Sequence, residues 1–499
     1  MKLNDLLHGI IECHKLPCVE IELLTDNSKK ACANALFVCV CGARFDGHDY
    51  AQQAYRNGCR VFVAQKRIDL PQDALIFTVA DTRRTLSLLA CRFFGDPSRK
   101  MRLIGITGTK GKTTTAQLIA HLFNTSNIPC GYIGTNGIDY ADCHRDTLNT
   151  TPDPLTLQGA LSDMLRHGVK TAVLEVSSQA LAQYRADGAV FETLLFTNLA
   201  LDHVGRGEHL DFDHYKACKK RLFTEFPAKR VIYWADDPHA NEIVTPPPPT
   251  PLIACSQALD SADYRLQNVT AIQNNSGFGV GYDLCQGGKI VSGYLPLLGK
   301  INAQNATLAL AAVTEMSGLS LEAAVKSLKN ALVAGRSEQK RLPSGACVCI
   351  DYAHNAFSLR QLLLSLREYT KGRLIVLFGS VGERTQLRRR EMGEVAAACG
   401  DLAILTSDNP GNEPPEDIIA DIASGFEGSK TPYESIPDRK TAILYALGLL
   451  KRGDILVLAG KGHENYQLIG REKLPFCESE IVEAYIASQN QRDIASAPI

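Results

Sequence analysis

Apolar and polar positions divide the chain into three successive segments. The first has short apolar runs at residues 35–42, 59–65 and 74–80, followed by a helical pattern at residues 82–95. Short runs rich in β-branched and aromatic residues predict strands, and apolar residues three and four positions apart predict a helix. The polar stretch at residues 96–100 (DPSRK) predicts a linker to the next segment.

The second and third segments alternate strand patterns with helix patterns. The predicted strands are residues 101–107, 171–177, 193–199 and 230–234, then 348–354, 373–380, 402–410 and 454–462. This alternation predicts βαβ units and mostly parallel sheets. We therefore expect an α/β protein of three domains: residues 1–99, a central P-loop-type ATPase domain at 100–334, and a Rossmann-like domain at 335–499. The proline run at residues 245–251 predicts an exposed loop.

Composition is ordinary for a soluble globular protein, with 45% hydrophobic and 21% charged residues among 499. The net charge of -1 gives no general attraction to nucleic acid or to an anionic membrane. The N-terminus lacks a signal pattern and no apolar run could span a membrane, so we expect a cytoplasmic protein, and a monomer. The 16 cysteines form no CxxC pair, and we interpret them as reduced, buried thiols rather than metal ligands or disulfides.

A glycine-rich turn at residues 105–114 (GITGTKGKTT) leaves a predicted strand and enters a predicted helix. Backbone N–H groups in such a turn bind phosphate oxygens together with the helix N-terminus. In the general motif the lysine reaches the β- and γ-phosphates and the next hydroxyl ligates Mg²⁺. Ile106 stands where that motif has a glycine, so the turn is a variant of it. We predict ATP contacts from Gly108, Thr109, Lys110, Gly111, Lys112, Thr113 and Thr114.

Polar residues cluster at the carboxyl ends of four predicted strands of the third segment. They are Asp351 and His354, residues 380–384, Asp408 and Asn409, and Lys461 and His463. Ligands of parallel α/β sheets bind beyond the carboxyl ends of the strands. This placement predicts an active site formed by two facing domains.

Residues 107–114 (TGTKGKTT) resemble the ATP loop of the Mur ligases and folylpolyglutamate synthetases. The similarity to the Mur ligase family extends over nearly the whole chain, through LTDNSKK, GARFDGHDY, NTTPDP, EVSSQALAQYR, FTNLALDH, GKINAQNATLA, AGRSE, DYAHN and AGKGHENYQ. The resemblance implies a ligase in which ATP phosphorylates a carboxylate and an amine then attacks the acyl phosphate. Within the family, it implies addition of the third amino acid to UDP-N-acetylmuramoyl-L-alanyl-D-glutamate in peptidoglycan biosynthesis.

The resemblance also implies roles for individual residues. The residues with implied catalytic roles are Lys112, Lys219 and His203. ATP contacts beyond the loop go to Asn305, near the adenine, Arg336 and Asp351. Contacts with the UDP-sugar peptide go to Ser28, residues 42–45, Asn149, Thr150, Thr151, Ser177, Gln183 and Arg185. Contacts with the incoming amino acid go to Arg384, Asp408, Asn409, Pro410, Gly411, Gly460 and Glu464.

A divalent cation is expected beside the phosphate loop. Glu175 lies near the end of one predicted strand and His203 lies just past the end of another, so with Thr113 they can ligate Mg²⁺. By resemblance, Lys219 is the family's carbamylated lysine. An ammonium has no lone pair for a metal, whereas N6-carboxylysine offers carboxylate oxygens. We expect the neighbouring Lys220 and Arg221 to be solvated. The segment at residues 202–219 is two residues longer than the usual family form.

The segment predicted to bind the incoming amino acid is where the sequence differs most from the family pattern. Family members that use meso-diaminopimelate carry DNPR, where this chain has DNPGN with Gly411 at the arginine position. Glycine cannot clamp a distal carboxylate, and Asp408, Glu413 and Glu464 would suit a distal ammonium. We therefore favour L-lysine or a similar amine-tailed amino acid. Meso-diaminopimelate remains the alternative, because an arginine placed elsewhere could restore the clamp.

Three other functions compete with this interpretation. A folate polyglutamylation enzyme shares the ATP loop but should lack the first domain. A nucleotide-binding regulator that hydrolyses ATP slowly would leave the polar strand ends of the third segment without a purpose. A paralogue that recycles muramyl peptides would share every motif, so the sequence leaves that alternative open.

Overall fold

The computed structural model describes residues 1–12, 17–42, 45–201, 205, 209–274, 277–333, 335–383 and 386–495. The chain divides into two compact units. Unit 1 consists of Met1–Arg265 and Thr307–Ser320, and unit 2 consists of Leu266–Ala306 and Leu321–Ile499. Within the described ranges, no helix is both long enough and apolar enough to cross a membrane.

Unit 1 begins with a parallel sheet in the order β1-β2-β3-β4. In β2, Leu36 and Val38 pack with α1 and α3, whereas Ala35 and Phe37 pack with α2 on the other face. Successive side chains of a strand point to opposite faces, so a continuous apolar run fits a strand covered on both sides. The elements are α1 (Leu3–Leu7), β1 (Leu23–Thr25), β2 (Ala35–Val38), η1 (Gly47–Tyr50), α2 (Ala51–Arg56), β3 (Val61–Ala64), β4 (Leu75–Thr78) and α3 (Thr82–Phe93).

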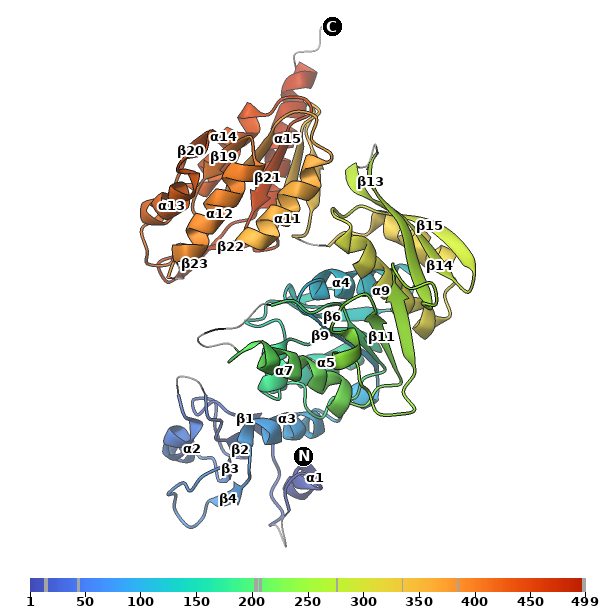
Figure 1. Cartoon of the computed structure of the whole chain (residues 1–499). Helices are drawn as coiled ribbons and strands as arrows, with labels where there is room; N and C mark the ends of the chain where they lie inside the picture. The colour runs from blue at the N-terminus through green and yellow to red at the C-terminus, as the bar shows by residue number, and fades with distance from the viewer. Residues whose placement is uncertain are drawn as a thin grey trace. The chain divides into compact units, whose positions relative to one another are not determined.

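The second sheet of unit 1 carries the phosphate loop. Within unit 1 its strands follow the order β12-β11-β10-β5-β9-β6-β7-β8, parallel from β12 to β6 and antiparallel beyond. Figure 1 labels β6, β9 and β11 of this sheet. β5 and β9 are neighbours, so their carboxyl ends lie side by side. The elements are η2 (Pro97–Arg99), β5 (Arg102–Thr107), α4 (Lys112–Thr125), β6 (Cys130–Gly134), β7 (Gly137–Tyr140), β8 (Cys143–Arg145), α5 (Pro154–Arg166), β9 (Thr171–Glu175), α6 (Ser178–Ala182), β10 (Thr193–Phe196), α7 (Phe212–Glu225), β11 (Arg230–Trp234), α8 (Ala240–Ile243) and β12 (Leu252–Ser256).

β13 carries the chain from unit 1 into unit 2, where β14 and β15 form an antiparallel pair. α9 later returns the chain to unit 1 for its second half. These elements are β13 (Tyr264–Asn274), β14 (Gly277–Gln286), β15 (Lys289–Leu295), α9 (Ile301–Ser317), α10 (Leu321–Ser327) and η3 (Leu328–Asn330).

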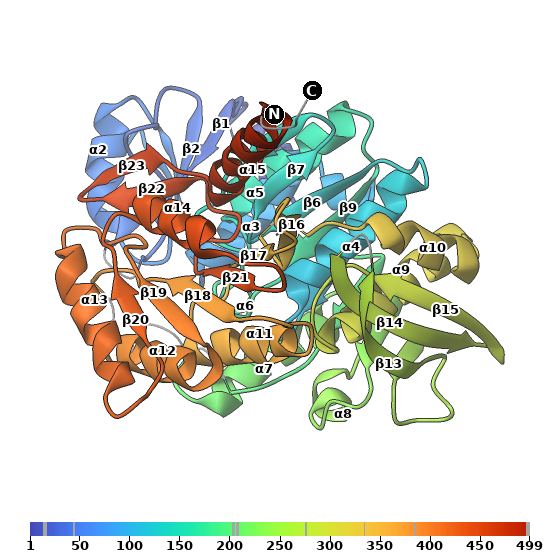
Figure 2. The same ribbon diagram turned by 90° about the horizontal axis from the view of Figure 1, so that it is seen from above.

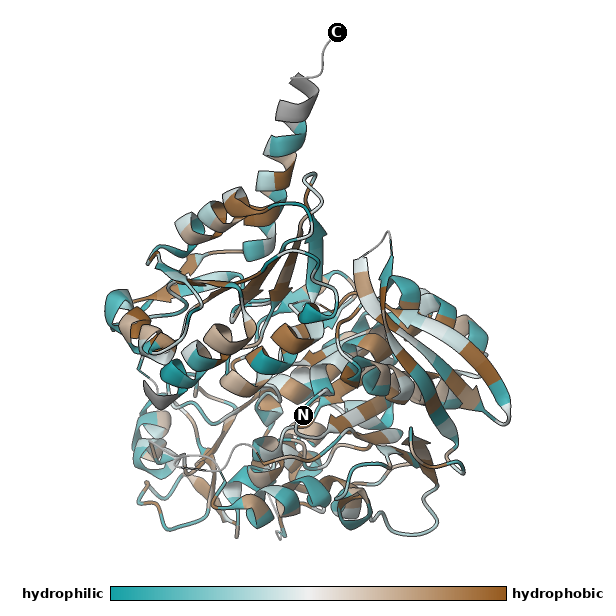
Figure 3. Cartoon of the chain, turned by 45° about the horizontal axis from the view of Figure 1, so that its top comes forward, coloured by the Kyte–Doolittle hydropathy of each residue, from teal (hydrophilic) through white to brown (hydrophobic). Residues whose placement is uncertain are grey.

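The main sheet of unit 2 has the order β16-β17-β21-β18-β19-β20 and is parallel except for β16. α11, α12 and α13 cover one face and α14 and α15 the other (Figure 2). Apolar colouring runs along its strands in Figure 3. The elements are β16 (Glu338–Arg341), β17 (Cys347–Asp351), α11 (Ala356–Arg367), β18 (Leu374–Phe378), α12 (Gln386–Cys399), β19 (Leu402–Leu405), α13 (Pro415–Ala423), η4 (Ser424–Phe426), β20 (Tyr433–Ser435), α14 (Arg439–Leu449), β21 (Ile455–Ala459), β22 (Tyr466–Ile469), β23 (Glu472–Pro475) and α15 (Glu478–Ala495).

The predicted α/β class with mostly parallel sheets is confirmed. The proline run lies between α8 and β12 and is largely exposed, as predicted. The cysteines in the described part of the chain are unpaired thiols, and Cys39, Cys347 and Cys349 are buried in strands or directly after one. Burial raises the pKa of the Cys39 thiol to about 12, which fits an inert core residue. The domain boundaries at residues 99 and 334 stay predictions.

Candidate functional site

The phosphate loop between β5 and α4 is shaped by residues that follow β10. The Thr109 N–H donates to the Asn198 carbonyl at 2.8 Å, and the Lys110 N–H donates to Asn198 Oδ1 at 2.9 Å. Thr197 Oγ1 donates to the Lys110 carbonyl at 2.7 Å. The loop therefore has a fixed backbone shape before any nucleotide arrives, as an anion-binding turn requires.

Gly108 has a backbone conformation that residues with a side chain adopt only with strain. Its φ is +151°, and a Cβ there would lie 1.9 Å from Thr197 Oγ1 and 3.0 Å from the Asn198 carbonyl oxygen. We expect Gly108→Ala to displace the loop and to raise the dissociation constant for ATP at least about tenfold, roughly the effect of losing one contact between the loop and a phosphate. Calorimetry measures this constant. Gly168→Ala is the control, because Gly168 also has a positive φ but an added Cβ would meet nothing within 4 Å. Equal ATP affinity in the two variants would contradict this role for Gly108.

Lys112, the first residue of α4, folds its side chain over the loop. Its Nζ donates to the Gly108 carbonyl at 2.8 Å and to the Thr109 carbonyl at 3.1 Å. The ammonium thus lies within the turn whose N–H groups would hold phosphates. Thr113 and Thr114 follow in the first turn of α4 and are buried.

Glu175 ends β9 beside this loop and is completely buried. Its Oε2 accepts from Thr113 Oγ1 at 2.9 Å, and its Oε1 accepts from Tyr132 OH at 2.5 Å and from the Thr135 N–H at 3.1 Å. Burial, reinforced by Glu175, raises the pKa of Tyr132, which keeps this phenol a hydrogen-bond donor. Thr113 and Glu175 thus bring a hydroxyl and a carboxylate together, and hard oxygen donors of this kind fit Mg²⁺.

Lys219 lies on α7 and is buried against the same loop. Its Nζ donates to the Gly108 carbonyl at 2.8 Å, the oxygen that Lys112 also contacts. The ammonium also lies 4.5 Å from the ring centroid of Tyr215, whose hydroxyl is 3.0 Å from Thr109 Oγ1. α7 is therefore tied to the phosphate loop by two side chains. His203, the third predicted metal ligand, lies outside the described residues.

The expectation that Arg221 is solvated is wrong. Its Nη2 donates to Asp187 at 2.6 Å and its Nε donates to Glu225 at 2.8 Å, and only 14% of its side chain is exposed. The guanidinium also stacks on the Tyr184 ring. Arg221 joins α7 to the chain after α6, so its role is structural.

Residues predicted to bind the UDP-sugar peptide form a connected network near the end of β9. Thr151 Oγ1 donates to the Glu175 carbonyl at 2.7 Å and accepts from the Ser177 N–H at 3.0 Å. Arg185 donates to the Thr151 carbonyl and to Gln183 Oε1, both at 2.8 Å. Burial lowers the pKa of Arg185, and the nearby Asp153 carboxylate opposes this effect.

The remaining residues of this set are placed separately. Thr150 Oγ1 lies 3.1 Å from Thr135 Oγ1, which links it to the Glu175 network. Asn149 is exposed. Ser28 lies in the N-terminal part of unit 1, where its hydroxyl donates to Gln53 Oε1 at 2.9 Å. Of residues 42–45, only Gly42 and Phe45 are described, and Phe45 is 68% exposed.

In unit 2, the strand ends gather around Lys461, which follows β21 and is completely buried. Its Nζ lies 3.5 Å from Asp408 Oδ1, 3.1 Å from Asn409 Oδ1 and 3.0 Å from Glu464 Oε2. Asn409 also donates to Glu464 at 2.9 Å. One ammonium therefore balances two carboxylates, which leaves this predicted amino-acid site with a net negative charge. A Cβ on Gly460 would lie 2.8 Å from Asp408 Oδ2, so glycine is needed there.

Gly411 lies in the loop between β19 and α13. Its φ is +61°, its N–H donates to the Leu468 carbonyl at 3.2 Å, and its carbonyl accepts from Gly470 at 2.7 Å. A Cβ at Gly411 would be nearest the Glu383 carboxyl group, at 3.7 Å. The position at which family members that use meso-diaminopimelate carry the clamping arginine thus faces a carboxylate in this chain.

Glu413, considered above for a distal ammonium, is bound within the protein. Both of its oxygens accept from Arg389, at 2.6 and 2.7 Å, and Arg389 also contacts Asp421 at 2.9 Å. The Arg389 guanidinium holds the pKa of Glu413 at about 2. Arg389 thereby fixes the loop that carries Pro410 and Gly411. Arg384 lies outside the described residues.

The other predicted nucleotide contacts lie in unit 2. Asp351 ends β17 and accepts from the Ser337 and Ala353 N–H groups at 2.8 and 2.9 Å. Burial raises the pKa of Asp351, against the effect of Arg336. Arg336 lies over the Tyr352 ring, with its guanidinium carbon 5.2 Å from the centroid. Asn305, on α9, is buried and donates to Asn302 Oδ1 at 2.9 Å.

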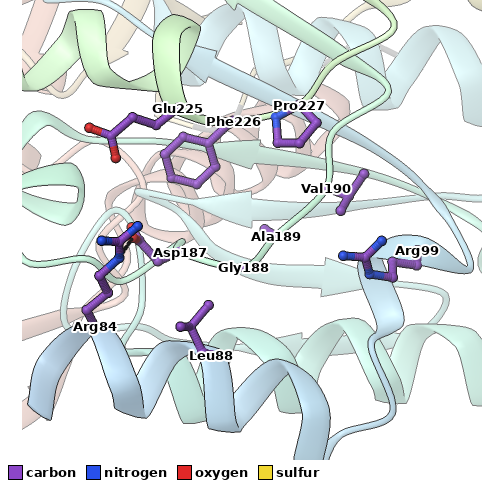
Figure 4. A pocket seen from close by; sticks show the side chains of 10 residues that line it. All are labelled: Arg84, Leu88, Arg99, Asp187, Gly188, Ala189, Val190, Glu225, Phe226 and Pro227. Atoms are coloured by element: carbon purple, nitrogen blue, oxygen red, sulfur yellow. Dashed lines mark ion pairs between the residues drawn. The ribbon is translucent and has the colours of Figure 1, made fainter. Parts of the chain in front are cut away.

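A cavity of about 180 Å³ lies between α3 and the chain that follows α6 (Figure 4). It is lined by Arg84, Leu88, Arg99, residues 187–190 and residues 225–227, none of which the sequence predicted for the site. Asp187 in its wall already pairs with Arg84 and Arg221. Among the described residues, none of those predicted for substrate, nucleotide or metal binding lines this cavity.

Sequence reasoning missed the residues that hold the site in shape. Asn198 stands within the motif FTNLALDH and Tyr215 lies four residues before Lys219, but their contacts with the loop cross about 90 to 106 positions of sequence. Lys461 was noted only as a polar strand end, although the AGKGH motif offered a signal. Its central place among Asp408, Asn409 and Glu464 depends on the strand order.

Comparison with known proteins finds matches to one protein family along most of the chain. Three family models match in succession: "Mur ligase family, catalytic domain" at residues 20–93, "Mur ligase middle domain" at residues 106–313, and "Mur ligase, glutamate ligase domain" at residues 335–462. The first match covers the segment that a folate polyglutamylation enzyme was expected to lack.

Curated relatives match over nearly their full length. The chain is 35% identical to the UDP-N-acetylmuramoyl-L-alanyl-D-glutamate–2,6-diaminopimelate ligase of Caldanaerobacter subterraneus over 496 residues, 98% of this chain and 100% of that protein. It is also 35% identical to the Bacillus cereus ligase of the same name over 498 residues, 97% of this chain and 99% of that protein. A solved structure of an enzyme with this name covers 98% of this chain and 99% of its own, with 29% identity and a TM-score of 0.71.

Proposed function

Because the chain belongs to the Mur ligase family, an ATP-dependent family of amide-forming ligases, we propose that it joins a diamino acid to UDP-N-acetylmuramoyl-L-alanyl-D-glutamate. The observation that carries the proposal is the shared carbonyl of Gly108, which both Lys112 and Lys219 contact beside the Thr113–Glu175 pair. This arrangement supports phosphoryl transfer, in which positioning and charge stabilisation supply most of the catalysis.

The proposed reaction has two steps. A substrate carboxylate oxygen attacks the γ-phosphorus and ADP leaves, and the amine then attacks the acyl carbon and phosphate leaves with that oxygen. Lys112 and the loop N–H groups would hold the triphosphate in line. Thr113, Glu175 and, in this proposal, His203 would hold Mg²⁺, which when bound offsets phosphate charge. The Thr151–Arg185 network would orient the acceptor peptide.

Carbamylation of Lys219 belongs to the proposal. Two ammonium groups that contact one carbonyl oxygen lie no further apart than twice 2.8 Å, so they repel each other, and the Lys219 ammonium is buried. Loss of a proton from Lys219 relieves this repulsion and gives the amine that attacks CO₂. The product is a carbamate anion and one released proton. The carbamate charge would then complement Lys112 and supply oxygen ligands beside Glu175.

We expect Lys219→Ala to lower turnover at least about 100-fold, because a charged group is lost at the phosphoryl site. Added formate or acetate should restore part of the rate by supplying the missing carboxylate. Lys220→Ala is the matched control, since the neighbouring lysine on α7 should leave the rate within about twofold. Steady-state phosphate release measures the rate of Lys219→Ala, its recovery with formate or acetate, and the rate of Lys220→Ala. Wild-type turnover in Lys219→Ala would rule the carbamate out.

The incoming amino acid is proposed to be L-lysine or a similar amine-tailed residue. Two carboxylates around one ammonium at Lys461, and a third at Glu383 facing Gly411, suit a distal amine. Meso-diaminopimelate is the second candidate, because the curated relatives named above are 2,6-diaminopimelate ligases. A distal carboxylate would need a cation that Gly411 does not supply.

The experiment is an amino-acid panel. Purified protein is given ATP, Mg²⁺ and UDP-N-acetylmuramoyl-L-alanyl-D-glutamate with each amino acid in turn, and products are identified by mass. We expect a tripeptide product and a higher kcat/KM with L-lysine than with meso-diaminopimelate. Preference for meso-diaminopimelate would reverse the order of the two candidates. Absence of any tripeptide, or extension of a folate instead, would refute the proposed function.

The domain boundaries at residues 1–99, 100–334 and 335–499 are part of the same proposal, since each matched family segment falls inside one of them. A cytoplasmic enzyme is also proposed, because its substrates would be ATP and a nucleotide sugar. We propose separately that it is a monomer.

A further inference from the structure

Three side chains that favour transition metals meet at the start of α7. One donor atom from each of His209, His214 and Cys218 lies within 4.8 Å of the donors of the other two. His214 and Cys218 are four residues apart on α7, so they share one face of the helix. His209 comes from the chain just before the helix. None of the three belongs to the Thr113–Glu175 site or to any other site described above.

The cluster is held in place from several sides. His209 is 1% exposed, and its Nε2 lies 2.8 Å from Ser178 Oγ, the kind of outer contact that orients a metal-binding imidazole. Its backbone carbonyl accepts from the Gly205 N–H at 3.1 Å. The rings of His209 and His214 have centroids 5.0 Å apart. Cys218 is buried, whereas His214 is half-buried and is the member of the cluster most accessible to solvent.

We propose that His209, His214 and Cys218 bind one borderline transition-metal cation, with Zn²⁺ the best fit and water as the fourth ligand. Imidazole nitrogen and thiolate sulfur are ligands that Zn²⁺ and Co²⁺ prefer, whereas Mg²⁺ prefers oxygen. Binding replaces the thiol proton with the metal and releases that proton to solvent. This cysteine thus departs from the general interpretation of the thiols as inert core residues.

The geometry needs only a small adjustment. Donors around a tetrahedral Zn²⁺ lie roughly 3.5 Å apart, given metal–ligand bonds of about 2.0–2.3 Å. The three side chains must therefore move inward by about 1 Å, which rotation of the half-buried His214 can supply. A bound ion would fasten the chain at His209 to the helix that carries Tyr215 and Lys219. The proposal does not depend on the ligase function.

Cobalt titration of the full chain, stripped of metal with a chelator, tests the site directly. Co²⁺ bound through a thiolate shows a near-ultraviolet charge-transfer band, and four-coordinate Co²⁺ shows strong visible bands. We expect both bands to saturate at one ion per chain, to disappear on addition of Zn²⁺, and to persist in excess Mg²⁺. Cys218→Ser should lose the near-ultraviolet band, and His214→Gln should bind Co²⁺ at least about 100-fold more weakly, since even an outer partner is worth 10–100-fold.

Cys285→Ser and His167→Gln are the matched controls, because both residues lie outside the cluster and should leave the bands unchanged. Circular dichroism checks that each variant is folded. Absence of a thiolate band in the unmodified protein would overturn the proposal regardless of how the variants behave. The same bands in Cys218→Ser would show that another cysteine binds the ion, and would equally overturn it.

Discussion

Lys112→Met should lower kcat/KM for ligation at least about 1,000-fold. The ammonium of Lys112 lies in the phosphate loop, 2.8 Å from the Gly108 carbonyl and 3.1 Å from the Thr109 carbonyl. A cation there would offset the charge that develops on the transferred phosphoryl group, and such groups are worth 10²–10⁵-fold in rate. Methionine keeps the length of the side chain and removes its charge. Coupled assay of ADP release measures the loss.

A surface lysine provides the control for Lys112. Lys229 is 72% exposed and contacts Glu192 at 3.4 Å, so Lys229→Met should leave kcat/KM within about twofold. Thermal unfolding should be similar for both variants, because the Gly108 and Thr109 carbonyls that Lys112 contacts belong to the turn directly before its own helix. Near-normal turnover in a folded Lys112→Met protein would contradict the assignment of the phosphate loop.

Arg439→Met should destabilise unit 2 by about 3–5 kcal/mol, the usual cost of leaving one member of a buried ion pair alone. Arg439 and Glu478 are both completely buried, with Nη2 and Oε1 2.8 Å apart. Arg439 also donates to the Ser407 and Ala459 carbonyls at 3.1 and 2.9 Å, just before Asp408 and Gly460. Chemical denaturation measures the stability, and the amino-acid site should lose affinity as well.

The pH dependence of this loss has a definite sign. Burial raises the pKa of Glu478, and Arg439 opposes that effect in the unmodified protein. In Arg439→Met the folded-state pKa rises further above the unfolded value, so protonation removes the buried charge as the pH falls. The destabilisation should therefore be largest at mildly alkaline pH and shrink in mild acid.

Replacing both partners separates the ion pair from simple packing. The double variant Arg439→Met/Glu478→Leu should recover most of the lost stability, because apolar residues of similar size often replace a buried pair at little cost. An equal loss in the single and double variants would show that the contacts of Arg439 with the two carbonyls, rather than the pair, carry the effect.

The position of the glycine-rich turn between β5 and α4 was predictable because local sequence determines it. A strand, a glycine-rich turn and a helix place Lys112 and Thr113, and parallel strands end at one edge of the sheet. β5 and β9 are neighbours, so Thr113 and Glu175 meet at 2.9 Å. The alternation of buried side chains in each strand follows from the same local geometry.

Charge pairing across the fold was not predictable from spacing. Arg221 looked solvated beside Lys220, but it reaches Asp187, 34 residues away, and Glu225 on its own helix. Glu413 looked available for a substrate amine, but Arg389 binds both of its oxygens. Whether a charged side chain is already satisfied depends on which elements pack together, and that information is not local.

The most direct test of acyl-phosphate chemistry follows oxygen through a single turnover. The acceptor UDP-N-acetylmuramoyl-L-alanyl-D-glutamate is labelled with oxygen-18 in the reacting carboxylate and incubated with ATP, Mg²⁺ and L-lysine. We expect the released phosphate to carry one labelled oxygen and the amide product to retain the other. Unlabelled phosphate alongside tripeptide product, or ATP hydrolysis with no amide formed, would contradict the account.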